Sequence, residues 1–404
     1  MKNENKIWQN SEFRLYLGST AFSGIAFAMQ QLLLSWTLIG ILEIPATQVG
    51  MIQAAAGIPG IFVMLLGGVR ADERDPRALL IRVYIFAPLL PVFLITLINL
   101  QLLNIFSVLI WALGMSLCVS YSSPAQQAIL NKIASSSVQK AVSAATAIGF
   151  IVQIFGLALA GTIDEYGLLP ALSFQATCIG LGAITVRRLN PQPPINATKE
   201  SSFKKLASGF RAIYEKPEIM QTLLINFISS VFNAGAFMTV FPFIVKEIYD
   251  GNAYTLSFLM IIFYAGATAS NFLMIRVMPV ARPGRIFLIM QLSRMLILGV
   301  VWLQPVFWIF ALACVGWGLN MGVTMTLART IVQESATEEY RARIMSVYSL
   351  GLLGSAPIGA LMLGRIVESF GTLNGLVPAI CISLILFLYG ILWTGVYQYR
   401  SPGK

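Results

Sequence analysis

Residues 187–218 read RRLNPQPPINATKESSFKKLASGFRAIYEKPE, and they form the one long polar interruption in an otherwise apolar chain. The stretch combines a proline-rich run with seven basic residues, which are Arg187, Arg188, Lys199, Lys204, Lys205, Arg211 and Lys216. Residues 1–186 precede it and residues 219–404 follow it. Such a stretch in the middle of the chain indicates a linker between two apolar halves.

Within this linker, apolar residues recur at helical spacing, at Phe203, Leu206, Phe210, Ile213 and Tyr214. Most of the basic residues fall on the other side of the same helix. The pattern predicts an amphipathic helix on the membrane surface, with its basic side chains near anionic headgroups. The alternative is a solvated linker whose charges bind nothing in particular.

The composition is that of an integral membrane protein. Hydrophobic residues make up 57% of the chain and charged residues 11%, with a mean hydropathy of +0.77, whereas soluble domains contain roughly 25% charged residues. The net charge of +10 has a topological explanation, because the basic residues lie in short loops between apolar spans. We therefore expect no nucleic-acid partner.

No metal or cofactor is expected. The chain contains no histidine, and its four cysteines lie inside apolar segments at unrelated spacings, which indicates neither a disulfide framework nor a metal cluster. The absence of a Walker motif also argues against ATP hydrolysis.

The apolar stretches are long enough to cross a bilayer, which takes about 20 residues. We predict spans near residues 13–38, 48–69, 79–100, 105–130, 141–163, 168–186, 219–245, 254–277, 286–303, 306–331, 344–367 and 373–397. Because every backbone polar group must be satisfied in lipid, and the short alternating segments of a barrel are missing, these spans should be helices. The expected fold is an all-α integral membrane protein of twelve transmembrane helices.

The loops alternate in charge, and this predicts the orientation. Basic residues gather before span one, after spans two and four, and in the linker, while the other loops of the first half are neutral or acidic. By the positive-inside rule, both termini and the linker are cytoplasmic. We expect a six-helix bundle over 1–186, a cytoplasmic basic linker over 187–218, and a second six-helix bundle over 219–404.

The two halves repeat one another. Residues 160–167 (AGTIDEYG) parallel 364–371 (GRIVESFG), and 129–131 (ILN) parallel 331–333 (IVQ). The separation is half the chain length, as expected for two pseudo-symmetric bundles related by an axis along the membrane normal. A substrate site would then lie between the halves near mid-membrane.

The loop after span two carries a family resemblance. Residues 67–77 read GGVRADERDPR, and Gly68, Asp72 and Arg77 match the spacing of the signature of the major facilitator superfamily. The resemblance implies a cytoplasmic gating latch formed by Gly68, Asp72, Arg74 and Arg77. A topogenic charged loop would explain the arginines but not the aspartate at that distance from the glycine.

This loop departs from the common signature at two places. Glu73 stands where an arginine is usual, and residues 75–76 are Asp-Pro where Gly-Arg is usual. Trp111 precedes Gly114 in span four, where many proton-coupled relatives have an arginine. The departures at Glu73 and 75–76 weaken the implied latch. Trp111 weakens the case for proton coupling through an arginine in span four.

Three further stretches resemble the enterobactin-exporter and macrolide-efflux branch of the superfamily. They are 205–211 (KLASGFR), 281–284 (ARPG) and 333–344 (QESATEEYRARI). The resemblance implies a secondary active transporter that exports a bulky amphiphilic, siderophore-like or drug-like molecule across the bacterial cytoplasmic membrane. The two-fold repeat and the proline-rich linker predict rocker-switch alternating access, in which one half rocks against the other. Its expected partners are this small-molecule substrate, membrane lipid and protons as coupling ion, and we expect a monomer.

Other function classes remain open. An uptake or facilitative permease would keep the same fold, as would a non-transporting receptor. A membrane-embedded enzyme is disfavoured, because no carboxylate lies well inside a span and no nucleophile has a neighbouring base.

Polar residues inside the spans define a candidate substrate cavity. They are Gln30, Gln31, Ser120, Ser123, Gln153, Asn226, Ser230, Asn233, Trp317, Asn320 and Thr324. Asparagines and an indole suit a pocket for an amphiphile. The alternative is that these groups join helices through hydrogen bonds and small-residue packing.

Two charged residues are candidates for energy coupling. Arg294 lies well inside span nine, and an ionisable residue there indicates function by default, although snorkelling or a structural partner is an alternative. Glu334 follows the polar end of span ten, near Arg329 and Arg341. If protons drive export, we expect Glu334 to carry them; the alternative is a surface ion pair.

Overall fold

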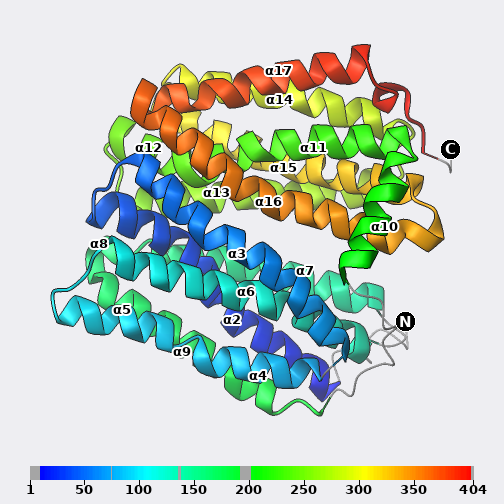
Figure 1. Ribbon diagram of the computed structural model, residues 1–404. Coiled ribbons are helices and arrows are strands. Elements are labelled where there is room, and N and C mark those ends of the chain that lie inside the picture. Colours follow the sequence, from blue (N-terminus) through cyan, green and yellow to red (C-terminus); the bar gives the residue numbers. More distant parts are fainter. Residues whose placement is uncertain (1–9, 74, 135–137, 192–201, 402–404) are drawn as a thin grey trace. The chain divides into compact units, whose positions relative to one another are not determined.

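The computed structural model describes residues 10–73, 75–134, 138–191 and 202–401. Within these ranges, twelve helical segments are long and apolar enough to cross a membrane. No strand occurs in the described part of the chain. The predicted all-α fold with twelve spans is therefore confirmed (Figure 1).

The spans of the first half are mostly single helices. They are α2 (Ser11–Trp36) continued by the π-helix η1 (Thr37–Ile41), α3 (Ala46–Glu73), α4 (Pro76–Phe86) with α5 (Leu89–Asn99), α6 (Ile105–Ala134), α7 (Val138–Ala160) with α8 (Ile163–Tyr166), and α9 (Leu168–Arg187). Pro88 separates α4 from α5, since a proline supplies no backbone N–H to the helical ladder.

The second half has the same plan. Its spans are α11 (Pro217–Gly235) continued by η3 (Ala236–Val240), α12 (Phe241–Phe243) and η4 (Ile244–Ile248), then α13 (Ala253–Val277), α14 (Pro283–Trp302), α15 (Phe307–Ser335), α16 (Glu338–Phe370), and η5 (Leu373–Leu376) with α17 (Val377–Leu392). The short η6 (Val396–Gln398) follows. A π-helix thus occurs near the end of span one and again in span seven.

The turns repeat as well. The described residues with positive φ form three pairs, each separated by about half the chain: Glu43 with Asp250, Gln101 with Gln304, and Gly167 with Gly371. Positive φ is sterically costly for side chains other than glycine. Its recurrence at equivalent turns agrees with the internal repeat.

The described helices form two compact units that do not follow the halves of the sequence completely. Unit 1 contains the chain up to Glu43, Ala55–Lys199 and Asn252–Ser257. Unit 2 contains Ile44–Ala54, Glu200–Gly251 and the chain from Phe258. Two helices, α3 and α13, therefore each begin in one unit and continue in the other.

The linker contains α10 (Ser202–Tyr214), which packs against α16 and α11 of unit 2. Gly209 permits this contact, because a Cβ there would lie 2.8 Å from the backbone oxygen of Arg343. Ile213 is buried on the same side, whereas Phe210 and Tyr214 are 54% and 79% exposed. The position of α10 on a membrane surface stays a prediction.

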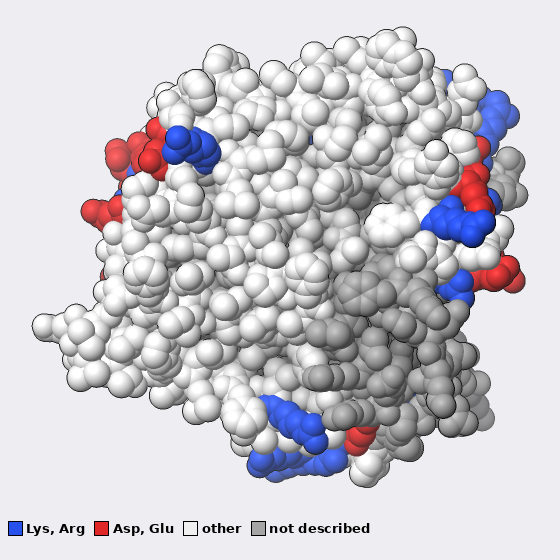
Figure 2. All heavy atoms as spheres, viewed as in Figure 1, with Lys and Arg blue, Asp and Glu red and all other residues white. Residues whose placement is uncertain are grey.

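Charged side chains gather near helix ends, and the long flanks of the helices are uncharged on the face in view (Figure 2). Large hydrophobic residues such as Phe106, Ile151 and Trp308 are exposed. This distribution is the one expected where helices face lipid.

Candidate transport site

The glutamines of unit 1 form two pairs between helices. Gln175 of α9 donates to Gln30 Oε1 at 2.9 Å and to the backbone oxygen of Ala26 at 3.0 Å. Gln153 of α7 donates to Gln31 Oε1 at 3.5 Å. Gln175 is fully buried, and nothing in its sequence surroundings singled it out. Both predicted glutamines of α2 thus contact a partner from another span.

A second polar network in unit 1 was also missed by the sequence reasoning. The Tyr84 hydroxyl donates to Ser23 Oγ at 3.1 Å, and Gln126 Nε2 donates to the same tyrosine oxygen. Tyr84 is fully buried. The available signal was a tyrosine inside an apolar span, since a buried hydroxyl needs a partner.

The serines predicted on α6 lie differently from one another. A Cβ at Gly60 of α3 would lie 2.6 Å from Ser120 Oγ and 3.0 Å from Ser116 Oγ. Ser116 and Ser120 therefore pack against a glycine of the neighbouring helix, whereas Ser123 is exposed. This contact is of the small-residue kind that brings membrane helices together.

In unit 2, Trp317 lies in an aromatic cluster. Its indole Nε1–H donates to Asn233 Oδ1 at 2.6 Å, and its ring meets those of Phe237, Phe241 and Phe263 at centroid distances of 5.7, 6.0 and 5.7 Å. Trp317 is 1% exposed. The predicted pair of an indole and an asparagine is thus brought together, with three phenylalanine rings in edge-to-face contact with the indole.

Asn320 and Thr324 of α15 are buried, but Asn320 contacts α14 instead of Trp317's cluster. Its Nδ2 donates to the backbone oxygen of Met290 at 2.6 Å and to Ser293 Oγ at 2.7 Å. The oxygens Asn320 Oδ1 and Thr324 Oγ1 are buried without a hydrogen-bond partner. On the predicted polar face of α15, Trp317 thus contacts α11, whereas Asn320 contacts α14.

Arg294 is buried, with 3% of its surface exposed. Its Nη2 donates to Gln291 Oε1, which also accepts from Ser229 Oγ at 3.0 Å. Arg294 Nε and Gln291 Nε2 have no partner. The described acceptor for this guanidinium is therefore an amide oxygen and not a carboxylate.

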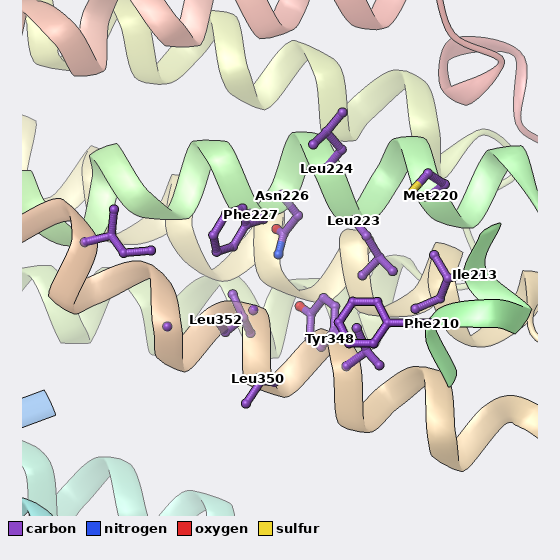
Figure 3. Close-up of a pocket in the computed structure, with 14 residues that line it drawn as sticks. Phe210, Ile213, Met220, Leu223, Leu224, Asn226, Phe227, Tyr348, Leu350 and Leu352 are labelled. Carbon is purple, nitrogen blue, oxygen red and sulfur yellow. The ribbon is translucent and has the colours of Figure 1, made fainter. Parts of the chain in front are cut away.

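Asn226 and Ser230 of α11 do not join Asn233 in one cluster. Asn226 is 5% exposed, and its side chain lies at the wall of a cavity between α10, α11 and α16 (Figure 3). Ser230 is half-buried. The candidate cavity residues of unit 2 thus lie in three separate surroundings.

The predicted cytoplasmic latch lies mostly outside the described residues. The side chains of Gly68, Asp72 and Arg74 fall outside them. Arg77 donates from Nη2 to the backbone oxygen of Arg187 at 2.6 Å. The Asp75 carboxylate caps α4 by accepting from the backbone N–H of Arg77 at 2.9 Å, which gives the departure at 75–76 a local structural role.

Two carboxylates cap the helices that begin in one unit and continue in the other. Asp164 Oδ2 accepts from the N–H of Ala253, the first residue of α13, at 2.6 Å, and Asp164 Oδ1 accepts from Trp36 Nε1 at 2.8 Å. Glu368 Oε2 accepts from the N–H of Thr47 in the first turn of α3 at 3.1 Å. Helix N-termini carry unpaired N–H groups and positive potential, which favour a carboxylate.

These two caps are related by the repeat. Asp164 and Glu368 occupy equivalent places in 160–167 and 364–371, and Thr47 and Ala253 are likewise half a chain apart. Each cap joins a residue of one sequence half to a helix of the other half. Sequence reasoning identified the repeat but not this contact, because the receiving N–H groups belong to unremarkable residues.

Close packing accompanies each cap. Ser257 of α13 donates to the backbone oxygen of Leu157 at 2.8 Å, and a Cβ at Gly364 would lie 2.6 Å from the backbone oxygen of Ala46. Gln53 of α3 adds a buried contact within unit 2, accepting from Thr239 Oγ1 at 2.7 Å and donating to the backbone oxygen of Met238 at 3.0 Å. The beginnings of α3 and α13 are therefore firmly held.

Glu334 binds hydroxyl groups of the C-terminal segment. Its Oε1 accepts from Ser401 Oγ at 2.7 Å, and its Oε2 accepts from the Tyr399 hydroxyl at 3.3 Å. Burial raises the pKa of Tyr399 above its ordinary value. The proposed neighbours Arg329 and Arg341 form no ion pair with Glu334 within the described chain.

Comparison with known proteins agrees with this architecture. Residues 8–396 match the family described as transmembrane secretion effector. The enterobactin exporter EntS of Shigella dysenteriae serotype 1 (strain Sd197) is 27% identical over 219 residues, as is that of Escherichia coli O139:H28. These matches cover 54% of this chain and 48% of each relative. The chain thus spans about half the length of the curated relatives it matches.

Solved structures show the fold. The nucleoside transporter NupG superimposes with a TM-score of 0.75 at 14% identity, over 95% of this chain and 99% of NupG. The xylose transporter XylE from E. coli, in an inward open conformation, gives 0.70 at 11% identity, over 97% and 98% of the two chains. From its twelve helices, its internal repeat and its family match, the chain belongs to the transmembrane secretion effector family and is a transporter of the major facilitator superfamily.

Proposed function

We propose that this transporter exports a bulky amphiphilic molecule of siderophore-like chemistry across the bacterial cytoplasmic membrane. Family membership supports transport, and the similarity to enterobactin exporters over half the chain supports the direction and the substrate class. Amide and indole groups buried in the spans supply hydrogen-bond donors and acceptors for the polar part of such a molecule. The substrate surface would be built from residues of both sequence halves.

The transport cycle is alternating access, in which one bundle rocks against the other. The observation that supports this mechanism is the pair of carboxylate caps. Each cap joins a residue of one sequence half to a helix of the other half, so movement of one half against the other would break it. In the capped state, Asp164 and Glu368 hold the beginnings of α13 and α3. In the opposite state these N–H groups would be released, and the caps therefore bias the equilibrium between the two states.

The first test removes both caps. The Asp164→Ala, Glu368→Ala double variant should shift the equilibrium away from the capped state on the order of tenfold, as expected for two lost helix caps. Spin labels at Asn131 and Gln333, in a background without cysteine, report this shift as a change in the ratio of two distance populations. The control is Glu165→Ala, which removes the adjacent exposed carboxylate and should leave the ratio unchanged.

Two outcomes would contradict this gating role. One is a single unchanging distance in wild type and variant, with and without substrate. The other is a shift of the same size in the Glu165→Ala control, because general loss of charge would then explain the effect.

Energy coupling is tested separately. We infer that Glu334 carries the coupling proton, because its carboxylate is held by two hydroxyl donors and not by a permanent cation. In proteoliposomes with an imposed pH gradient, Glu334→Gln should lower gradient-driven flux at least about tenfold, while Glu339→Gln on the exposed first turn of α16 should not. Gradient-driven flux that survives in Glu334→Gln eliminates this residue, and a wild type that ignores the gradient eliminates protons.

The export proposal itself is tested with cells and vesicles. Metabolite profiles of cells with and without the protein should differ in a released amphiphile, and enterobactin is the first compound to assay in inverted vesicles. Accumulation inside such vesicles corresponds to export. Depletion, or binding without flux, would instead favour an uptake permease or a receptor.

A further inference from the structure

A cavity of about 360 Å³ lies within unit 2, between α10, α11 and α16 (Figure 3). Its walls are almost wholly apolar and include Ile213, Leu223, Phe227 and Leu352. Its polar lining side chains are Asn226 and Tyr348, and the Tyr348 hydroxyl contacts the backbone oxygen of Met325 at 3.4 Å. The cavity is open on one side, where lining residues such as Phe210 and Leu224 are exposed, and its apolar walls suit an apolar ligand.

Helix α10 closes one side of this cavity and carries features of a lipid-facing helix. Phe210 lines the cavity although it is 54% exposed, and Tyr214 on the same edge is 79% exposed. Arg211, next to Phe210 in the sequence, is also exposed. Exposed aromatic residues next to basic residues are typical of segments at the boundary between lipid tails and headgroups.

The charge of the linker sequence favours an anionic headgroup. Residues 202–216 contain four basic residues, Lys204, Lys205, Arg211 and Lys216, against one acidic residue, Glu215. Arg211 and Glu215 form an exposed pair with an N–O distance of 3.4 Å, and exposed pairs of this kind are weak. A phosphate could therefore take over the guanidinium, to which it binds in a bidentate manner.

We propose that this cavity binds one acyl chain of an anionic phospholipid, whose phosphate lies at Arg211 of α10. Transfer of a chain from the bilayer into the cavity gains little from the hydrophobic effect, since both surroundings are apolar. The gain comes from the dispersion contacts that the chain makes with the cavity walls. Selection among lipids then rests on the headgroup, so anionic lipids should be preferred over zwitterionic ones.

Gly351 permits a direct test, because it lines the cavity and a Cβ there would meet Phe227 Cδ2 at 3.6 Å, an ordinary contact. A Cβ at Gly351 therefore meets no clash, and Gly351→Leu should occupy part of the cavity. The matched control is Gly299→Leu on α14, where a Cβ meets nothing within 4 Å. Thermal unfolding of both variants establishes that they are folded.

The measurement is lipid retention by the purified full-length protein in native mass spectrometry. We expect wild type and Gly299→Leu to retain one phosphatidylglycerol under conditions that remove phosphatidylcholine, and Gly351→Leu to bind phosphatidylglycerol at least about tenfold more weakly. Arg211→Gln should reduce the preference between the two lipids. Equal retention in Gly351→Leu and wild type, or equal retention of both lipids by wild type, overturns the proposal.

A second measurement does not depend on the glycine variant. Phe210→Trp adds a fluorophore at the cavity to the seven tryptophans of the chain, and its quenching is therefore taken as the difference from wild type. Both proteins are placed in vesicles of phosphatidylcholine and phosphatidylglycerol at 3:1 with bromine on the acyl chains of one lipid. Per mole of brominated lipid, quenching should be stronger when the bromine is on phosphatidylglycerol. Quenching in proportion to the lipid ratio contradicts a specific site. If Gly351→Leu abolishes transport while lipid binding persists, the cavity belongs to the cargo and the lipid proposal fails.

Discussion

Replacing Gln291 by leucine should destabilise unit 2 by about 3 kcal/mol or more, whereas replacing Arg294 by methionine should be neutral or stabilising. Gln291 Oε1 accepts hydrogen bonds from both Arg294 and Ser229. Its removal leaves a buried guanidinium with no acceptor, and Arg294 Nε already lacks one. A buried cation without a partner is costly, while an unbranched apolar chain of similar length has no such cost.

Thermal or denaturant unfolding of the purified protein in one detergent measures both variants. Gln48→Leu is the control, since Gln48 is an exposed glutamine in α3 and such substitutions usually fall within about 0.5 kcal/mol. Gln291→Glu supplies a carboxylate to Arg294 and should retain most of the stability. If Arg294→Met is as damaging as Gln291→Leu, the guanidinium contributes stability that its described contacts do not account for.

Alanine at Gly359 should be more damaging still, because two helix backbones touch at this position. A Cβ on Gly359 of α16 would lie 2.0 Å from the backbone oxygen of Val231 and 2.9 Å from Gly235 Cα of α11. Backbone atoms cannot rotate away as a side chain can. We expect a loss of more than about 3 kcal/mol, beyond the usual range for overpacking, and loss of the α11–α16 contact on which unit 2 is built.

Gly299→Ala is the matched control for this crossing, because a Cβ at Gly299 meets nothing within 4 Å. Alanine there should stabilise α14 by roughly 0.5 to 1 kcal/mol through its higher helix propensity. The unfolding midpoints of the two variants should therefore move in opposite directions. A Gly359→Ala variant of wild-type stability would show that α11 and α16 do not need this approach.

Much of the fold followed from the sequence, and the bilayer is the reason. A span must be long, apolar and internally hydrogen-bonded, so the twelve helices could be counted from residue types alone. The repeat between 160–167 and 364–371 predicted the paired bundles, and Gly68 with Asp72 indicated the superfamily. The confirmed calls concern the fold, the superfamily and its exporter branch, while substrate, latch and coupling remain proposals.

The partner of each polar side chain was decided by the tertiary structure. Gln30 was predicted to need a partner, but only helix packing brings Gln175 to it from 145 residues away. The N–H that Asp164 caps belongs to Ala253, a residue with no distinguishing chemistry. Helical spacing tells which residues share a face, but the rotation of each helix depends on shape at contacts such as Gly235 with Gly359. The sequence thus determined which segments cross the membrane, and close packing determined which side chains meet.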